Sequence, residues 1–246
     1  MGNGAAALVE ELAAANKVWH FEQAELLHGL QAHEIQRFLN LSVDHIFADQ
    51  RPIFEPGEEA DRVFILNRGV VRLQVPNLNS REKTVAVLIG GEVFGLESLA
   101  ESQAYQLEAV AHEEAWVSSI AGADVRSLAV AIPQFALNAI QILVRRLGDA
   151  TEDIHSLCFL DIEQRLIRTL LKLADRHGKP LRHRNGSVKL KVRISHEHLA
   201  RLLGANRPYL SNIMSSFKKK GWIGYSNHRL LIHRPALEKA AGSWLS

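Results

Sequence analysis

The sequence predicts an α+β fold in which an antiparallel sandwich or barrel precedes a long helix and a winged helix-turn-helix. Between residues 51 and 120, short apolar runs alternate with glycine, proline and asparagine turns, a texture typical of antiparallel strands. A 3.5-residue apolar repeat then runs from Ala136 to Leu157, and the segment from Asp161 onward is strongly basic. These features predict a β-rich half, a helical connection and a small domain of helices and a hairpin.

The charge of the chain is divided between its two halves. From Asp161 to the end there are 18 Lys and Arg against 5 Asp and Glu, whereas the preceding 160 residues carry 11 against 22. A net charge of +13 therefore stands beside −11 within an overall +2. Clustered cations on one small domain indicate a polyanionic partner, because each neutralised phosphate releases condensed counterions. The C-terminal half therefore predicts a nucleic acid partner.

The composition, 47% apolar and 23% charged, is that of a globular protein with a buried core. Cys158 is the only cysteine, which excludes an internal disulfide framework and any iron–sulfur cluster or zinc site with four thiolates. It stands in the apolar run Leu157–Leu160, where we expect a buried, inert thiol. The sequence has no 18-residue apolar stretch and no basic N-terminal region, so we expect a cytoplasmic protein without a membrane span.

The first elements are a helical segment and a series of strands. Residues Glu22 to Asn40 have helical texture. The strand-like runs that follow are Arg62–Leu66, Val70–Val75, Thr84–Leu88 and Ala115–Ile120. The predicted turns are Pro56-Gly57, Asn67-Arg68-Gly69, Pro76-Asn77 and Gly90-Gly91. Polar and apolar residues alternate in some of these runs, so part of the sheet keeps a solvated face.

The most regular stretch of the chain is a narrow apolar seam. Its members are spaced alternately by four and three residues over three heptads: Ala136, Ile140, Leu143, Leu147, Ala150, Ile154 and Leu157. A sustained seam of this period predicts one long helix that pairs with an identical helix in a homodimeric coiled coil. The alternative is a helix lying on its own domain, for which a broader apolar face is expected.

A new helix begins after the seam. Asp161 and Gln164 form a capping box that predicts a helix over Ile162–Arg176, ended by His177-Gly178. The segment Val188–Ile194 alternates apolar and basic residues and is predicted to be a strand.

The basic segment then contains two short helices around a glycine turn, followed by a hairpin. Ser195 caps a helix that reaches Leu203, Gly204 makes the turn, and Asn206 caps a second helix that ends near Lys220. The closing strands are Trp222–Tyr225 and Arg229–His233. This order is that of a winged helix-turn-helix, whose second helix presents its first residues to the major groove of DNA.

The second helix carries side chains suited to duplex DNA. Arg207, in its first turn, can donate two bonds to guanine, and Asn212 can pair with adenine. The lysine run at its far end is placed for phosphates, and the net charge of the domain disfavours the alternative of a merely solvated helix end. The predicted DNA contacts are Ser195, His196, Asn206, Arg207, Tyr209, Ser211, Asn212, Lys218, Lys219, Lys220 and His228.

Three local signatures occur in order along the chain. The first is Pro56-Gly57-Glu58 with Val63–Leu66 and Gly69, the second is Gly91–Gly95, and the third is Arg145-Arg146-Leu147 with Leu157–Asp161 and Arg165. In this order and spacing, they resemble the Crp/Fnr superfamily of bacterial transcription regulators, over about residues 26 to 233. The first signature looks like the first half of the family's sensory β-roll, the second like the start of its phosphate-binding cassette, and the third like its dimer helix and hinge.

The resemblance implies a specific architecture and set of partners. Residues 1–132 would form a cyclic-nucleotide-binding-like β-roll (a double-stranded β-helix), residues 133–160 the dimerisation helix and hinge, and residues 161–246 the DNA-binding domain. The roll would sense an unidentified small-molecule effector and reorient two recognition helices on palindromic double-stranded DNA. RNA polymerase would be a further partner of the homodimer.

The cassette departs from the pattern of cyclic-nucleotide binders. Leu96, Tyr105 and Gln106 stand where the family places the Glu for the ribose and the Arg-Ser pair for the phosphate, and Ala150 and Thr151 stand at the purine contact. A buried phosphate without its arginine loses the charge-assisted bonds that offset desolvation, so cyclic AMP is disfavoured. The candidate effector pocket is Gly91, Phe94, Gly95, Leu96, Glu97, Ser98, Tyr105, Gln106 and Thr151.

Histidines leave a haem cofactor open, because neutral imidazole is its usual ligand. Those in the sensor half are His20, His28, His33, His45, His112 and His155, and no local motif singles out one of them. The DNA-binding half holds His196, His198 and His228, which fit bonds to the DNA backbone better than a metal. Pro208 occupies the position where many relatives place a base-reading Glu, so the operator is expected to differ from the family consensus.

Two other classes of function compete with a DNA-binding regulator. A regulatory signal-binding module without DNA binding also uses the β-roll, but the basic winged-helix half argues against it. An enzyme is not predicted, because the sequence contains no glycine-rich phosphate loop, HExxH or GxSxG pattern. His196-Glu197-His198 lacks the i, i+4 spacing of two ligands on one helical face, and no metal site is predicted.

Overall fold

The computed structural model describes residues 24–75, 83–100, 103–181 and 186–242. They belong to two compact units, one formed by the residues up to 76 with 85–147 and the other by 77–84 with 148–246. The division falls inside a helix, between Leu147 and Gly148.

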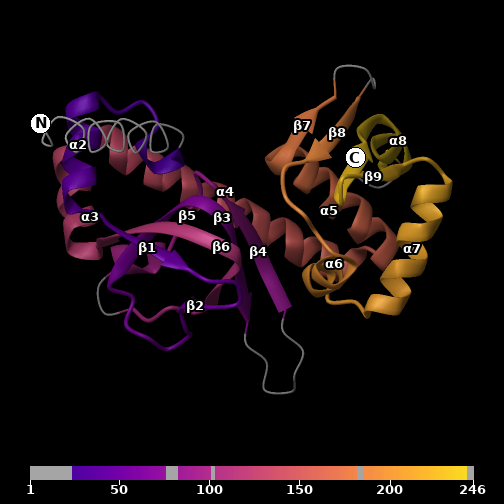
Figure 1. Ribbon diagram of the computed structural model, residues 1–246, viewed down its shortest axis with the longest axis horizontal. Coiled ribbons are helices and arrows are strands. Elements are labelled where there is room, and N and C mark those ends of the chain that lie inside the picture. The colour runs from indigo at the N-terminus through magenta and orange to yellow at the C-terminus, as the bar shows by residue number, and fades with distance from the viewer. Residues whose placement is uncertain (1–23, 76–82, 101–102, 182–185, 243–246) are drawn as a thin grey trace, which may run out of the picture. The chain divides into compact units, whose positions relative to one another are not determined.

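The first unit is built on a six-stranded sheet (Figure 1). Its strands are β1 (Val43–Phe47), β2 (Pro52–Phe54), β3 (Arg62–Val75), β4 (Lys83–Ile89), β5 (Val93–Phe94) and β6 (Glu108–Ala121). The order is β1-β6-β3-β4, with β2 added to β6 and β5 to β3. The β1/β6, β2/β6, β3/β5 and β3/β6 pairings are antiparallel. The predicted antiparallel roll is therefore confirmed, with three strands (β1, β2 and β5) that the sequence pattern did not single out.

One predicted turn is wrong. Asn67-Arg68-Gly69 does not end a strand, because β3 continues through it with two shifts of register against β6. Gly69 has φ of 100°, and a Cβ there would stand 2.4 Å from the carbonyl oxygen of Glu114. A glycine in this conformation makes a bulge that bends the strand without breaking it.

Short helices close the first unit. They are the 3-10 turns η1 (Glu25–Leu27) and η2 (Leu96–Leu99), and the helices α2 (Ala32–Leu41) and α3 (Gly122–Ala131). The predicted helical stretch, Glu22 to Asn40, is divided, because Gly29 takes φ of 75° between η1 and α2. Glu22 lies outside the described residues. A core of Leu26, Phe38, Val63, Val93 and Phe135 joins these elements.

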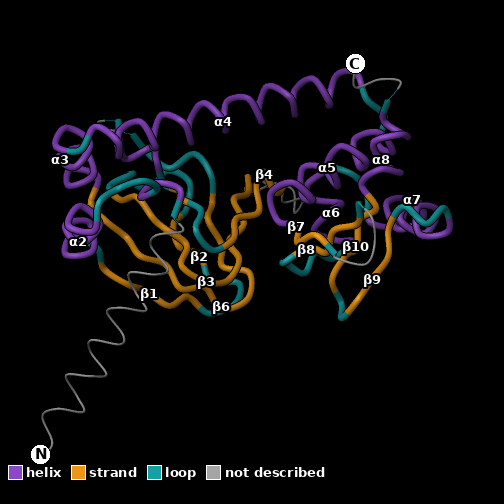
Figure 2. The backbone as a smooth tube through the Cα atoms, turned by 90° about the horizontal axis from the view of Figure 1, so that it is seen from above, coloured by secondary structure: helices purple, strands orange, loops and turns teal. Residues whose placement is uncertain are grey.

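The predicted long helix is confirmed as α4 (Pro133–Phe159), which runs without a break (Figure 2). One face of it, Phe135, Ala139 and Ile142, packs into the first unit. The predicted seam is a different face, on which Ile140, Leu143, Leu147, Ile154 and Leu157 are 45–70% exposed. The helix thus satisfies its own domain and still presents an uncovered apolar stripe.

Two further points concern α4. Cys158 is exposed, so the expected burial is wrong for the single chain: its neighbours in the apolar run belong to the uncovered stripe rather than to a core. Among the described helices no single one is long and apolar enough to cross a membrane; α3 and α4 pass only as a pair bent by 118°.

The second unit contains the remaining elements. They are α5 (Ile162–His177), β7 (Gly178–Pro180), β8 (Ser187–Leu190), α6 (His196–Leu203), α7 (Arg207–Lys219), β9 (Ile223–Ser226), β10 (Arg229–His233) and α8 (Arg234–Ala241). The strands form an antiparallel sheet of order β7-β8-β10-β9. The winged helix-turn-helix is confirmed. The predicted strand Val188–Ile194 ends early, at Leu190, and β7 and α8 were not predicted.

The capping box of α5 forms as predicted. Asp161 accepts a bond from the backbone of Gln164 at 2.8 Å, and the Gln164 side chain accepts one from the backbone of Asp161 at 3.0 Å. Leu166 and Leu170 of α5 and Phe217 of α7 are fully buried, so the second unit has a core of its own.

Candidate DNA interface and effector pocket

Local capping fixes where the two helices of the basic domain begin. The Ser195 hydroxyl accepts from the backbone of His198 at 3.2 Å, and the Asn206 side chain accepts from that of Tyr209 at 2.8 Å. Between them Gly204 takes φ of 62°, the left-handed turn that ends α6 and redirects the chain. Two predicted DNA contacts, Ser195 and Asn206, therefore have a structural task, because their oxygens satisfy free amides of the first helical turns.

The recognition helix α7 separates buried and exposed residues cleanly. Leu210, Ile213, Met214 and Phe217 are buried. The predicted contacts Arg207, Tyr209, Asn212, Lys218 and Lys219 are exposed, and Ser211 is partly exposed. All of the predicted α7 contacts therefore lie away from the core, on the side of the helix that can meet a groove.

Arg207 has an acidic neighbour, Glu197, that no sequence pattern singled out. Its Nε lies 3.8 Å from Glu197 Oε2, and Glu197 Oε1 lies 3.5 Å from Arg201 Nε on the same helix. The Arg207 side chain remains 68% exposed. The ion pair can limit the rotamers of Arg207 while leaving its outer nitrogens accessible.

His196 is partly exposed, and both of its ring nitrogens contact hydroxyl groups of the same domain. Its Nδ1 lies 3.0 Å from the Ser211 hydroxyl of α7, and its Nε2 lies 2.8 Å from the Tyr225 hydroxyl of β9. Burial and the nearby Arg207 lower the pKa of His196 below its usual value. One imidazole thus joins α6, the recognition helix and the wing, and no sequence spacing predicted that Tyr225 would take part.

The three lysines after the recognition helix differ in their surroundings. Lys219 is exposed, and Lys218 Nζ lies 6.0 Å above the ring of Tyr225. Lys220 turns back onto its own domain, with Nζ 4.4 Å above the ring of Trp222 and 3.5 Å from Glu163. Lys218 and Lys219 are better placed for phosphates than Lys220.

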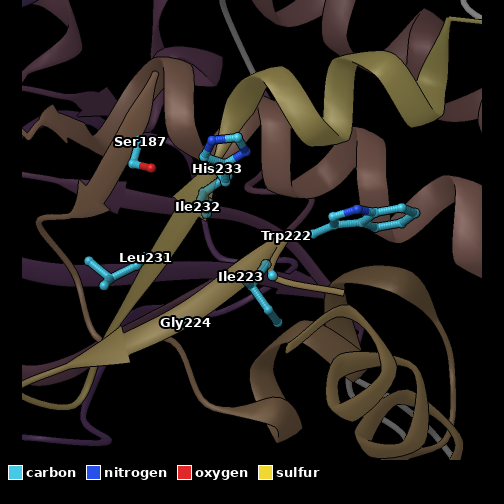
Figure 3. A pocket seen from close by; sticks show the side chains of 8 residues that line it. Ser187, Trp222, Ile223, Gly224, Leu231, Ile232 and His233 are labelled. Carbon is cyan, nitrogen blue, oxygen red and sulfur yellow. The ribbon is translucent and has the colours of Figure 1, made fainter. Parts of the chain in front are cut away.

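The wing ends in a tight turn. Asn227 and His228 both have positive φ, 50° and 59°, as a two-residue hairpin turn of this kind requires. His228 is exposed at the tip. A pocket beside the wing is lined by Ser187, Gly221, Trp222, Ile223, Gly224, Leu231, Ile232 and His233 (Figure 3). None of the predicted DNA contacts lines it.

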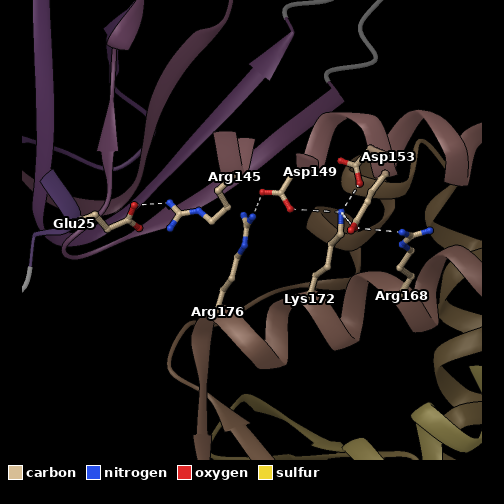
Figure 4. Close-up of polar contacts among 8 residues, drawn as sticks. Glu25, Arg145, Asp149, Asp153, Arg168, Lys172 and Arg176 are labelled. Carbon is tan, nitrogen blue, oxygen red and sulfur yellow. Dashed lines mark hydrogen bonds and ion pairs between the residues drawn. The ribbon is translucent and has the colours of Figure 1, made fainter. Parts of the chain in front are cut away.

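Many cations of the basic domain are paired internally. Asp149, Glu152 and Asp153 of α4 face Arg168, Lys172 and Arg176 of α5 (Figure 4). Burial raises the pKa of Glu152, but the bonds and charges of Lys172 and Arg168 outweigh it and hold that pKa below its usual value. Arg168, Lys172 and Arg176 of α5 are therefore engaged by carboxylates of α4, which reduces the positive charge that α5 presents to an outside anion.

Several residues of the candidate effector pocket are packed into the interior of the first unit. Tyr105 is 3% exposed and stacks on Phe54 with ring centroids 3.8 Å apart. Its hydroxyl donates to the carbonyl of Arg62 at 2.9 Å and accepts from the Arg62 amide at 3.1 Å. Burial raises the pKa of Tyr105 to about 12, so the hydroxyl keeps its proton and both bonds persist at neutral pH.

The rest of the cassette supports the same packing. Phe94 and Leu96 are buried, and Ser98, also buried, donates to the Gly95 carbonyl at 2.9 Å. Gly95 takes φ of 74° where a Cβ would meet Phe64 and the Arg62 carbonyl. Other predicted pocket residues remain partly or fully accessible: Gly91, Glu97 and Gln106. Thr151, the last member, lies on α4 in the second unit.

Arg146 adds a partly buried cation near this cassette. Its guanidinium donates to the carbonyl of Val93. Burial lowers the pKa of Arg146, while the charges of Glu25, Glu92 and Glu97 act in the opposite direction. The arginine is thus committed to the backbone of the roll and to surrounding carboxylates.

Two of the described sensor-half histidines are bonded to neighbouring polar side chains. His45 Nε2 lies 2.9 Å from the Ser119 hydroxyl, and His112 Nδ1 lies 3.3 Å from the Gln50 amide. Within the described ranges no three His, Cys, Asp or Glu side chains are grouped as metal ligands would be. His20 lies outside those ranges.

Two family profiles match the chain in this arrangement. One, described as a cyclic nucleotide-binding domain, matches residues 45–131, and the other, described as a Crp-like helix-turn-helix domain, matches residues 164–240. Together they span both the roll and the recognition helix with its wing.

Individual relatives and solved structures are similar to this chain over most of its length. The cyclic AMP receptor protein of Thermus thermophilus is 29% identical over 198 residues, covering 80% of this chain and 87% of that protein. A CRP-like cAMP-activated global transcriptional regulator of Mycobacterium tuberculosis is 26% identical, covering 73% and 79%. A CRP-family transcriptional regulator from Thermus thermophilus superposes with a TM-score of 0.64 at 26% identity, covering 82% and 98%. A CooA mutant from Carboxydothermus hydrogenoformans shares the fold, with a TM-score of 0.71 at 23% identity over 83% and 89%.

Proposed function

The chain belongs to the Crp/Fnr superfamily of transcription regulators, and we propose that it binds palindromic duplex DNA as a homodimer through α7 and its wing. The observation that carries this proposal is the division of α7 into a buried apolar face and an accessible face with Arg207, Tyr209, Asn212 and Lys219. A fork-shaped guanidinium and a carboxamide are the groups that read guanine and adenine edges.

The homodimer follows from the uncovered stripe of α4. Leu147 and Ile154 are 70% and 63% exposed, an arrangement that costs free energy unless a second helix covers it. Pairing two identical seams would place two recognition helices about a two-fold axis, as a palindrome requires. The assignments of residues 1–132 as sensor, 133–160 as dimer helix and hinge, and 161–246 as DNA-binding domain complete this proposal, together with RNA polymerase as partner and the cytoplasm as location.

Operator selection tests DNA binding directly. The full-length protein is equilibrated with a random duplex library, and the retained sequences are determined. We expect a palindrome whose half-site centres lie about 34 Å apart, one helical turn, and an affinity that falls steeply with salt. Recovery of unselected sequences only, or binding without salt dependence, would contradict the proposal and favour a signal-binding module that does not act on DNA.

Cyclic AMP is not the proposed effector, although two relatives are named for it. The reason is that Tyr105 fills the cassette position of the phosphate-binding arginine and directs its hydroxyl at Arg62. Calorimetric titration of the full-length protein with cyclic AMP should therefore show no saturable binding. Micromolar affinity, about −8 kcal/mol, would mean that the Phe54–Tyr105 stack opens and that other residues replace the missing arginine.

A further inference from the structure

His196 makes two hydrogen-bonding contacts, but a neutral imidazole has only one N–H group to donate. Its two ring nitrogens lie 3.0 Å from the Ser211 hydroxyl and 2.8 Å from the Tyr225 hydroxyl. A neutral imidazole carries one N–H, so it can donate to only one of these oxygens. The other contact must be an O–H donated to the bare ring nitrogen.

Protonation would change this arrangement without moving a heavy atom. An imidazolium carries two N–H groups, so both hydroxyl oxygens accept and neither has to donate to the ring. The hydroxyl proton that was directed at the imidazole becomes available to an outside acceptor. Ser211 is partly exposed on α7, and Tyr225, on the wing, is 43% exposed, so either can meet a phosphate oxygen.

The surroundings of His196 favour the neutral ring in the free protein. Burial and, from α7, the charge of Arg207 together lower its pKa. From the wing side, Lys218 Nζ lies 6.0 Å from the Tyr225 ring. Glu197, next to it on α6, is directed at Arg207 and Arg201, and His198 contacts Ser195. A phosphate at this surface would offset the cationic neighbours.

We propose that His196 takes up one proton from solvent when duplex DNA binds and thereby frees the hydroxyl proton of Ser211 or Tyr225 to donate to a phosphate oxygen. His196 is then a positioning residue, because its protonation changes the hydrogen bonds of the recognition helix and of the wing together. The inference rests on the proposed function, since it concerns the same DNA interface.

The sign of the pH dependence follows from linkage. A group whose pKa is higher in the complex than in the free protein adds affinity that is complete below the free pKa and disappears as pH rises through the pKa in the complex. DNA affinity should therefore increase as pH falls through the range between these two pKa values. The limit for a single proton is a change of about tenfold in Kd for each pH unit.

The experiment measures the Kd of the full-length protein for its selected operator at constant salt between about pH 5 and pH 8, the interval in which histidines titrate. His196→Gln should remove most of the pH dependence, because glutamine keeps a donor and an acceptor but does not titrate. His33→Gln, a matched histidine control at an exposed position of α2 in the first unit, should keep it. Calorimetry of the wild type in two buffers of different ionisation enthalpy should show net proton uptake on binding.

A second pair of variants protects the test against misfolding of His196→Gln. Tyr225→Phe and Ser211→Ala keep the imidazole but each removes one hydroxyl, so at least one of them should reduce the dependence of Kd on pH. A wild-type Kd that is constant with pH, or an unchanged slope in His196→Gln that remains folded by circular dichroism, would overturn this inference and leave operator binding intact. Absence of salt-dependent binding at every pH would instead overturn the proposed function.

Discussion

The cassette of the β-roll and the recognition helix of the basic domain differ in the exposure of their candidate functional side chains. Phe94, Leu96 and Tyr105 are 0%, 6% and 3% exposed, whereas the Arg207 side chain is 68% exposed and Tyr209 is 49% exposed. In the roll, Phe94 and Tyr105 make aromatic contacts, and the Tyr105 hydroxyl bonds to the backbone of Arg62. On α7, polar groups remain at the surface with loosely held partners. The predicted contact residues of α7 are therefore accessible, whereas Phe94, Leu96 and Tyr105 of the cassette belong to the packed interior of the roll.

The largest expected effect concerns the proposed homodimer, which would place two copies of both regions about one axis. Leu147→Glu would place two like charges face to face in the paired seam, at a cost of about 3–5 kcal/mol for uncompensated buried charge. Sedimentation should show a monomer with much weaker operator binding. Gln141→Glu, exposed on the same helix but off the seam, should remain a dimer. A dimeric Leu147→Glu variant would place the association surface elsewhere.

The next prediction tests whether Tyr105 stabilises the roll by packing in its core. Tyr105→Ala removes a buried ring stacked on Phe54 and should lower the free energy of unfolding by about 3–5 kcal/mol, measured by urea denaturation. Tyr105→Phe keeps the ring but leaves the amide and carbonyl of Arg62 without their partner, a loss of about 1–3 kcal/mol. Equal stability of all three proteins would mean that the cassette is not core, and the contrast with α7 would fail.

Base reading by Arg207 tests the accessible region. Arg207→Ala should cost about 1–3 kcal/mol on the selected operator and relax the preference at one base pair in each half-site. Binding is measured on the operator and on single-base variants of it. If Arg207→Ala weakens every sequence alike, the arginine contacts phosphate and α7 lies differently in the groove.

The smallest expected effect separates two neighbouring lysines. Lys219→Ala should weaken operator and scrambled DNA alike and reduce the slope of log K against log salt by about one. Lys220→Ala should leave that slope unchanged, because Lys220 Nζ is held over Trp222 and near Glu163. The reverse result would show that the lysine most engaged within the domain is the one that meets phosphate.

Elements with local signals could be predicted from the amino-acid sequence. The capping box at Asp161, the cap at Asn206 and the 3.5-residue seam each depend on residues within a few turns of one another, and the corresponding helices form as predicted. The charge division likewise pointed to the domain that carries the recognition helix, because net charge is additive along the chain.

Which of the candidate side chains are available depends instead on long-range packing. Such contacts place Tyr105 beside Arg62, 43 residues away, and Tyr225 beside His196, 29 residues away. They also turn Arg168, Lys172 and Arg176 inward and leave Cys158 outside a core. These outcomes follow from how strands register and helices pack, and a one-residue change of register moves a side chain to the opposite face of a sheet. The sequence pattern therefore located the candidate DNA interface, and tertiary packing decided which of its side chains are accessible.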